Sequence, residues 1–317
     1  MTETNNELAL VVDTPADAGE RADVVLGRRL PGVSRRVARR LGLEGHLYLD
    51  GRKIPPSTRV PAGSRLALRV AHGGTAQPVT VLASTDHFVY VLKPPGMHTH
   101  RLRPDDASTL ADAVALAHPE CREASPDPRQ GGAVHRLDRG TTGVIAFART
   151  LEAWRIAREA FRSRRVLKLY RALVRADPDS DPWPPQRTGL TTITETAPVG
   201  PWPTAQTPGL RIAAPLGPSG RRRVMVRADG RAAVTEAWSL DVDDAGHREM
   251  LLRLVTGHRH QARVHLAWLG HPIVGDSSYD GTPSARLRLH AAVLDLSEGC
   301  PGEPRVQAPM PDDWTVA

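Results

Sequence analysis

The chain has 317 residues, 40% hydrophobic and 24% charged, which indicates a globular protein of about two domains and excludes a disordered chain or a short peptide. Its 42 basic and 35 acidic residues give a net charge of +7, which favours a polyanionic partner. Lysine occurs only at positions 53, 93 and 168, so arginine, which forks onto phosphates and stacks on bases, carries almost all of the charge. A genome that prefers arginine codons would produce the same excess, and composition alone does not separate the two explanations.

Short features of the sequence indicate the expected redox and membrane environments. Cys121 and Cys300 form no C-x-x-C pair, which argues against a disulfide framework and against a thiolate zinc site. The N-terminus, MTETNNELALVV, lacks the basic start of a signal peptide, and no apolar run approaches the roughly 18 residues that span a bilayer. We therefore expect a cytoplasmic protein without a membrane partner.

The N-terminal part of the chain predicts a small basic unit. We expect residues 1–19 to be flexible and residues 20–71 to fold. Asp23 is the predicted N-cap of a first helix that ends near Leu30, and Ser34 is the predicted N-cap of a second that ends at Gly42. Short strands are expected at residues 46–49 and 65–70, with a turn at residues 50–51.

The second predicted helix is crowded with positive charge. Arg35 and Arg39 are four residues apart, as are Arg36 and Arg40, so the four guanidinium groups share one side of the helix. Such crowding costs stability unless a polyanion neutralises it. A solvent-exposed helix with chance arginines is the alternative.

The order of motifs in this unit resembles the small S4-like RNA-binding module. The features that carry the resemblance are the R-x-D-x-x-L start, the Ser-Arg-Arg helix, the L-Y-L-D-G-R turn and the V-P-A-G-S-R-L close. The resemblance implies that the four arginines of the second helix bind RNA.

A polar, glycine-containing linker is expected at residues 72–78, followed by a larger unit at residues 79–317. Residues 177–210 are rich in Pro and Thr, show no periodicity and are expected to form an irregular insertion. Apolar periodicity predicts helices at 151–164 and 259–269, and strands at 79–83, 88–92, 144–148, 166–174, 233–241 and 249–256.

The segment VHRLDRGTTG, residues 134–143, places Asp138 between two arginines in a loop just before a predicted strand. Fixed positive charge favours the ionised form of a carboxyl group. Such a carboxylate suits a nucleophile better than a general acid. A structural Asp–Arg turn pair is the alternative.

Two further side chains are candidates for the same site. Arg263 lies in the first turns of a predicted helix, where a cation opposes the macrodipole and is expected mainly where an anion needs it. Tyr170 lies in mid-strand beside Lys168, and its ring is able to stack on a base. Taken singly, Arg263 is also explained as an exposed helix charge and Tyr170 as a core or rim residue.

Taken together, these segments are similar to the RluA-type pseudouridine synthases along nearly all of residues 79–317. The matching segments are KPPGM at 93–97, HRLDRGTTG at 135–143, KLYRALV at 168–174, TGHRHQARVHL at 256–266, LGHPIVGD at 269–276 and LHA at 289–291. The resemblance implies an α+β fold in which a mixed, mainly antiparallel sheet with flanking helices surrounds a central cleft, joined to a small α/β RNA-binding domain. The N-terminal module points to the branch of the family that acts on large-subunit ribosomal RNA, with transfer RNA as the alternative substrate.

The resemblance also implies roles for individual residues. Asp138 matches the catalytic aspartate, Arg263 the arginine that pairs with it, and Tyr170 the aromatic residue that packs on the target uracil. Arg136 matches the side chain that fills the gap left by the flipped nucleotide. Substrate contacts are expected from three residues of that motif, namely Arg136, His135 and Thr141.

The chemistry of the implied reaction fits these residues. Conversion of uridine to pseudouridine breaks the glycosidic bond, turns the base and rejoins it through carbon, with no redox change, so we expect no cofactor and no metal. The reaction requires an ionised carboxylate at the sugar–base junction, a guanidinium that holds it and a surface that retains the detached ring. The nucleotide must also leave its stack, at a cost that phosphate contacts offset. Three routes are compatible with the sequence: attack of the aspartate on the anomeric carbon, its addition to the ring, and a glycal route. We expect the protein to be a monomer.

The sequence departs from the family pattern at four positions. Thr142 replaces the usual serine, His258 an arginine, Arg259 a hydroxyl residue and Ala262 a larger aliphatic residue. Because the aspartate and its arginine are present, these changes concern substrate contacts more than chemistry.

Two other functions are compatible with parts of the sequence. A metal-dependent hydrolase is suggested by the ligand-like spacing of two histidine groups, but no acidic ligand completes a zinc motif near His98 and His100 or near His258, His260 and His265. An RNA-binding ribosome-assembly protein without catalysis is the other rival, and the presence of all three candidate catalytic residues weighs against it.

Overall fold

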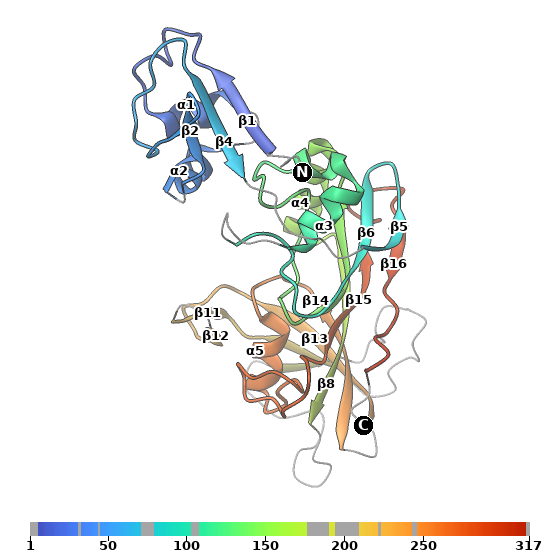
Figure 1. Ribbon diagram of the computed structural model, residues 1–317. Coiled ribbons are helices and arrows are strands. Elements are labelled where there is room, and N and C mark those ends of the chain that lie inside the picture. The colour runs from blue at the N-terminus through green and yellow to red at the C-terminus, as the bar shows by residue number, and fades with distance from the viewer. Residues whose placement is uncertain are drawn as a thin grey trace.

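The computed structural model describes residues 6–30, 33–43, 45–70, 79–102, 108–175, 190–193, 209–220, 223–242 and 246–314. These residues form a mixed α+β protein with a four-stranded and a ten-stranded sheet, and a two-stranded ribbon beside them. The four-stranded sheet and its helices form a small lobe at one end of the molecule (Figure 1). The expected fold class is therefore confirmed. Among the described residues, no helix combines the length and the apolar character that crossing a bilayer requires.

The small lobe packs two helices on one antiparallel sheet. Helix α1 spans Ala22–Arg29 and helix α2 spans Arg35–Leu43. Their apolar faces meet the sheet around Leu26, Leu41 and Leu66, which are fully buried. The strand order is β1 (Asn6–Val11), β4 (Arg65–Val70), β2 (Leu47–Leu49) and β3 (Arg52–Lys53).

Two expectations for this lobe were wrong. Residues 6–11, predicted to be flexible, form β1, which pairs with β4 so that Leu8 lies opposite Leu68 and Leu10 opposite Leu66. Arg21, not Asp23, is the N-cap of α1. Asp23 is buried inside the first turn, where its two oxygens accept hydrogen bonds from the Arg21 guanidinium at 3.0 Å each. The alternation that identifies β1 was too short to be recognised without its partner strand.

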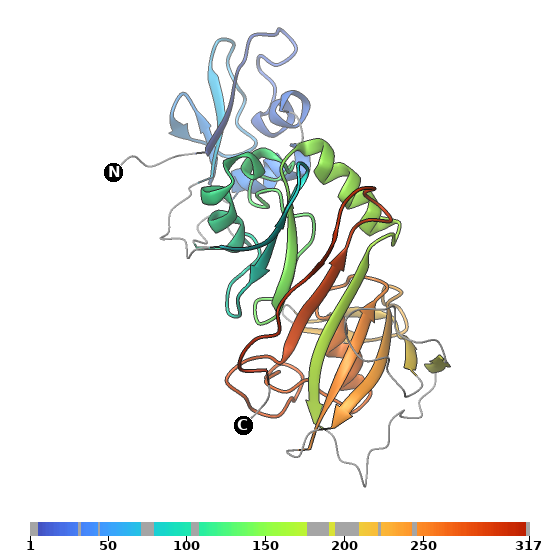
Figure 2. The same ribbon diagram turned by 90° about the vertical axis from the view of Figure 1, so that its right-hand side faces the viewer.

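The large sheet holds the rest of the described strands except the ribbon, β11 (Leu216–Ser219) and β12 (Arg223–Val226). β15 lies in its middle, between β7 and β8 (Figure 2). β16 (Arg305–Gln307) pairs with the far end of β15. The strand order is β5 (Thr80–Ser84), β6 (Phe88–Lys93), β7 (Thr142–Ala148), β15 (Leu289–Asp295), β8 (Leu167–Arg175), β14 (His247–Leu254), β13 (Val234–Val242), β10 (Gly209–Ala213) and β9 (Leu190–Ile193).

The contact between β7 and β15 is the one parallel pairing among the described strands of this sheet. It brings Gly143 so close to β15 that a Cβ atom there would lie 2.1 Å from the carbonyl oxygen of Ala291. Gly143 also has φ +118°, a conformation that side chains rarely adopt. Only glycine therefore fits where the loop that carries Asp138 enters the sheet.

Three α-helices flank the large sheet. α4 (Leu151–Arg162) is capped by Thr150, whose hydroxyl accepts the Ala153 N–H at 3.1 Å, and it buries a stripe of alanines. α5 (Gln261–Trp268) begins two residues later than expected because His260, its N-cap, has φ +57° and is therefore not helical. α3 (Leu110–Ala117) continues into a 3₁₀ turn at Pro119–Glu123.

The prediction of an irregular insertion at residues 177–210 is wrong for residues 190–193 and 209–210, which belong to strands. The first of these stretches is β9, and the second begins β10, which pairs with it. A strand here was missed because the Pro- and Thr-rich composition masked it. The remaining residues of that segment and the expected linker at residues 72–78 lie outside the described part of the chain.

Candidate active site

A buried lysine, Lys93, holds the loop that carries Asp138 through hydrogen bonds to backbone carbonyl groups. Lys93 is 0% exposed, and its ammonium donates to the carbonyl oxygens of Pro94, Arg139 and Thr141 at 2.8, 3.1 and 2.9 Å. The loop is closed by the Thr141 N–H, which donates to the Asp138 carbonyl at 3.1 Å. Burial lowers the pKa of Lys93 to about 7, because the charged form loses its hydration. The lysine thus ties the segment that follows Asp138 to the end of β6.

Arg263 pairs with Asp138 as expected. It is the third residue of α5, and its Nη1 donates to Asp138 Oδ2 at 3.2 Å. The side chains are 10% and 15% exposed, so both lie in a partly desolvated site where an ion pair is screened less than at the surface. Arg263, a cation near the start of α5, therefore has an anionic partner in Asp138.

Asp276, for which the sequence predicts no role, also binds Arg263. Its two oxygens accept from Arg263 Nε at 2.7 Å and from Nη2 at 2.8 Å, and its side chain is 1% exposed. Carboxylate and guanidinium thus form a bidentate pair, the strongest form of this contact. No local signal in LGHPIVGD identifies this role, because the partner lies 13 positions away on a helix.

His260 and Tyr279 complete the surroundings of the pair. His260 Nε2 lies 3.9 Å from Asp138 Oδ2, and its Nδ1 lies 2.8 Å from the Tyr279 hydroxyl. The Tyr279 ring centre is 5.1 Å from the guanidinium carbon of Arg263, within cation–π range. Burial lowers the pKa of His260, so the ring is neutral at neutral pH.

Tyr170 lies in β8 and faces the same space. It is 7% exposed, and it shares with Asp138 a narrow inner pocket of about 50 Å³. Burial raises the pKa of Tyr170, with a smaller contribution from the Asp138 charge, so the phenol stays neutral. The inner pocket is lined by Arg136, Leu137, Asp138, Thr141, Tyr170, Leu254, His258, His260, Gln261, Ala262, Arg263 and Leu289.

A larger opening, the basic groove, joins the inner pocket at Asp138 and Tyr170. It has a volume of about 790 Å³ and runs along the exposed side of α4. Six cationic side chains line it against two carboxylates, so its charge suits a polyanion. The cationic residues are Arg136, Arg155, Arg158, Arg162, Lys168 and Arg259, and the acidic ones are Asp138 and Glu159.

The three predicted substrate contacts occupy different positions. Arg136 is exposed and lines both cavities, and Thr141 is buried against the inner pocket. His135 lines only the basic groove, where its ring stacks on Phe161 at 5.0 Å and its Nε2 accepts the Ala146 N–H at 3.3 Å. Burial lowers the pKa of His135 to about 3, so this ring is a neutral wall of the groove.

The predicted RNA-binding arginines lie in the small lobe, apart from this site. Arg35, Arg36 and Arg39 are exposed along α2, while Val37 and Leu41 face the core as expected. The side chain of Arg40 lies outside the described part of the structure.

The residues that depart from the family pattern attach the site to its surroundings. His258 Nε2 lies 2.9 Å from the Ala232 carbonyl, and Arg259 Nη2 donates to the Arg223 carbonyl of β12 at 3.1 Å. His265, a member of the supposed metal group, bonds instead to Thr235 Oγ1 and to the Ala214 carbonyl, both at 2.9 Å. Among the described residues, no three or more His, Cys, Asp or Glu side chains are arranged to hold a metal ion.

Comparison with known proteins agrees with this geometry. Residues 87–268 match the family model described as RNA pseudouridylate synthase, and residues 20–66 match the S4 domain. The ribosomal large subunit pseudouridine synthase D of Xanthomonas campestris pv. campestris is 32% identical over 334 aligned residues, covering 98% of this chain and 91% of that protein. The ribosomal large subunit pseudouridine synthase C of Escherichia coli K12 is 30% identical over 98% of this chain and 95% of its own.

A solved structure has the same fold. Human RNA pseudouridylate synthase domain containing 1 superposes with a TM-score of 0.52 at 23% identity, covering 77% of this chain and 87% of that one.

Proposed function

Because this chain belongs to the RluA-type family of RNA pseudouridine synthases and carries an N-terminal S4 domain, we propose that it isomerises uridine in large-subunit ribosomal RNA with Asp138 as nucleophile. The observation that carries the proposal is the ion pair of Asp138 and Arg263 at 3.2 Å, placed where the inner pocket opens into the basic groove. The names of the two bacterial relatives favour ribosomal over transfer RNA.

The two cavities suit the two parts of the substrate. The inner pocket presents a carboxylate, a guanidinium and an aromatic ring, the three groups that a detached uracil and its ribose require. The basic groove has the charge to hold the phosphates of the strand on either side. We propose that the target nucleotide flips out of its stack into the inner pocket and that Arg136, which lines both cavities, contacts the strand at the gap.

The reaction needs no atom beyond those of the substrate. The bond between the ribose C1′ and the uracil N1 breaks, the base turns, and C5 bonds to C1′. N1 gains one proton and C5 loses one. The bond that Asp138 forms with the nucleotide as nucleophile breaks again before release, so the net reaction is an isomerisation. Arg263 orients the carboxylate through its hydrogen bond, and Tyr170 packs on the ring while it is detached.

The test uses the full-length protein and its Asp138→Asn variant. Each is incubated with unmodified transcripts of the large-subunit ribosomal RNA and the transfer RNAs of the source organism, and pseudouridines are mapped by carbodiimide labelling and primer extension. We expect conversion at defined uridines of the ribosomal RNA, a loss of at least about 1,000-fold in the variant, and RNA affinity within a few-fold of wild type.

Three outcomes would reject part or all of the proposal. Conversion of transfer RNA alone would reject the ribosomal substrate. If the Asp138→Asn variant converts uridine as fast as the wild-type enzyme, Asp138 is not the nucleophile. Tight RNA binding by a wild-type protein that converts no uridine in either RNA would favour the non-catalytic assembly protein.

A further inference from the structure

The loop of residues 276–279, which we call the positioning loop, contacts both side chains that approach Asp138. Asp276 at its start binds Arg263, and Tyr279 at its end binds His260. The loop is closed by backbone hydrogen bonds from Tyr279 and Gly281 to the Asp276 carbonyl, at 3.2 and 2.9 Å. One short turn thus determines where two partners of the catalytic carboxylate lie.

Asp276 decides how Arg263 meets Asp138. A guanidinium next to a carboxylate tends to form a two-bond fork, and Arg263 has two carboxylates within reach. The fork is made with Asp276, at 2.7 and 2.8 Å, and only Nη1 remains for Asp138, at 3.2 Å. The Ser278 N–H donates to Asp276 Oδ1 at 3.0 Å and fixes the orientation of that carboxylate.

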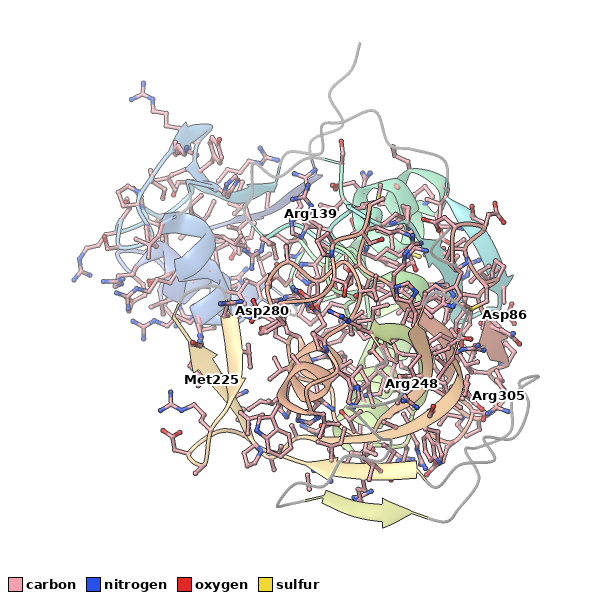
Figure 3. The ribbon with its side chains drawn as sticks, turned by 90° about the horizontal axis from the view of Figure 1, so that it is seen from below. Asp86, Arg139, Met225, Arg248, Asp280 and Arg305 are labelled. Atoms are coloured by element: carbon pink, nitrogen blue, oxygen red, sulfur yellow. The ribbon has the colours of Figure 1, made fainter. Side chains whose placement is uncertain are left out.

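Tyr279 decides which nitrogen of His260 carries the proton. Its hydroxyl oxygen accepts the Val224 N–H at 3.0 Å, so its own proton is free to reach His260 Nδ1 at 2.8 Å. The neutral ring then carries its proton on Nε2, the atom 3.9 Å from Asp138 Oδ2. In Figure 3, Asp280, which follows Tyr279, and Met225 of β12 lie on the same side of the molecule, consistent with this link to the ribbon.

Both partners therefore approach the same oxygen of Asp138. Arg263 and His260 face Oδ2, and Oδ1 has no hydrogen bond from any residue that the structure describes. An arginine that forked onto Asp138 would occupy both oxygens and leave neither for the substrate.

We propose that Asp276 and Tyr279 are positioning residues, which hold Arg263 and His260 on Oδ2 of Asp138 and so reserve Oδ1 for the junction between ribose and uracil. This inference rests on the proposed function. It assigns the loop a role in the rate of the reaction, distinct from that of the basic groove in RNA affinity.

The first test is Asp276→Asn, which keeps the volume of the side chain but replaces one acceptor oxygen with an NH₂ group that cannot accept from Arg263. Arg263 is then free to fork onto Asp138. At saturating large-subunit ribosomal RNA transcript we expect kcat to fall about 100-fold, with KM within about threefold of wild type. A higher KM at unchanged kcat would overturn the proposal.

The second test is Tyr279→Phe, which removes only the hydroxyl. Because one hydrogen bond orients His260, we expect kcat to fall about tenfold at constant KM, with the melting temperature close to wild type. This variant keeps the proposal testable if Asp276→Asn does not fold. If Tyr279→Phe has the kcat of the wild-type enzyme, the proposal that Tyr279 positions His260 for the reaction is wrong.

A matched control separates positioning from stability. Glu249 forms a comparable largely buried pair with Arg171, whose Nε donates at 2.9 Å, and it lines neither cavity. We expect Glu249→Gln to lower the melting temperature and leave kcat within about twofold of wild type. If Asp276→Asn behaves like this control, Asp276 only neutralises a buried arginine and the inference fails, whereas failure of the proposed function would already appear as inactive wild-type protein.

Discussion

Asp138 and Arg263 are 125 positions apart in the sequence, yet they meet at 3.2 Å across the middle of the large sheet. Asp138 precedes β7, and Arg263 follows β14 on α5. β15 pairs with β7 on one side and with β8, the neighbour of β14, on the other. The ion pair is therefore a product of strand order, and the site depends on the integrity of the sheet.

The ring of Tyr170, rather than its hydroxyl, is expected to serve the reaction. Its hydroxyl forms no hydrogen bond with a described residue, and burial keeps it neutral by raising its pKa. We expect Tyr170→Phe to retain kcat within about threefold, and Tyr170→Leu, which keeps apolar volume but removes the ring, to lose about 10- to 100-fold. Steady-state kinetics on the ribosomal transcript decide this, and equal losses in both variants would assign the role to the hydroxyl.

The arginines of α4 are expected to set RNA affinity. Arg155 is exposed along the basic groove and forms no ion pair with a described residue. We expect Arg155→Ala to raise Kd several-fold, to reduce the slope of log Kd against log salt by about one and to leave kcat unchanged.

Arg305 provides the control for that variant. It is 38% exposed on β16 and does not line the basic groove. Figure 3 shows it across the molecule from Met225. Arg305→Ala should leave both Kd and the salt slope at wild-type values. The same loss of affinity in both variants would mean that net charge, and not the groove, attracts the RNA.

The α2 helix of the small lobe is expected to be a second phosphate contact. Arg35, Arg36 and Arg39 are exposed on it, and no acidic residue lies in its first turn. Replacing all three with alanine should weaken RNA binding and reduce the salt slope by about two to three, without changing kcat at saturating RNA. Filter binding at several salt concentrations measures the effect, and an unchanged affinity would show that α2 does not contact phosphate.

Two buried histidines predict a loss of stability in acid. His265 and His290 are 0% exposed, and burial lowers the pKa of each to about 4, from an ordinary value near 6.5. Between these values the unfolded chain binds protons that the folded protein does not, so stability rises with pH across this window and is lost as pH falls through it.

The expected slope is at most about 1.4 kcal/mol per pH unit for each histidine. Urea unfolding at pH 5.0, 6.0 and 7.5 measures it, and a His265→Gln variant should show a shallower slope than wild type. Equal stability of the wild-type protein at pH 5.0 and pH 7.5 would contradict the prediction.

Regular apolar patterns identified most elements that flank the site. The strand expected at 166–174 is β8 at Leu167–Arg175, and the helix expected at 151–164 is α4 at Leu151–Arg162. α4 is half-buried, and its buried alanines at 153, 157 and 160 leave a helical period in the sequence. β8 is buried at six consecutive positions, 169–174, so its burial does not alternate and its apolar run alone indicated the strand. β15 is buried at six of its seven positions, so its run LHAAVLD does not alternate, and it was missed as a strand.

The site was predictable only in part, for a related reason. Asp138, Arg263 and Tyr170 stand in distinctive motifs, whereas Asp276 and Tyr279 act through contacts that only the folded loop creates. One missed helix did have a local signal. Thr109 and Asp112 form a capping box at the start of α3, a pattern of hydroxyl and carboxylate three residues apart that precedes an apolar run.

The late position of β15 in the chain has a consequence during translation. Until residues 289–295 leave the ribosome, β7 and β8 in the nascent polypeptide have no strand to join them, and each presents an open edge that is prone to self-association. The enzyme thus becomes competent only after residues 289–295 have been synthesised. A chain that terminates prematurely before residue 289 would contain Asp138, Tyr170, Arg263 and Asp276, and would still not assemble them.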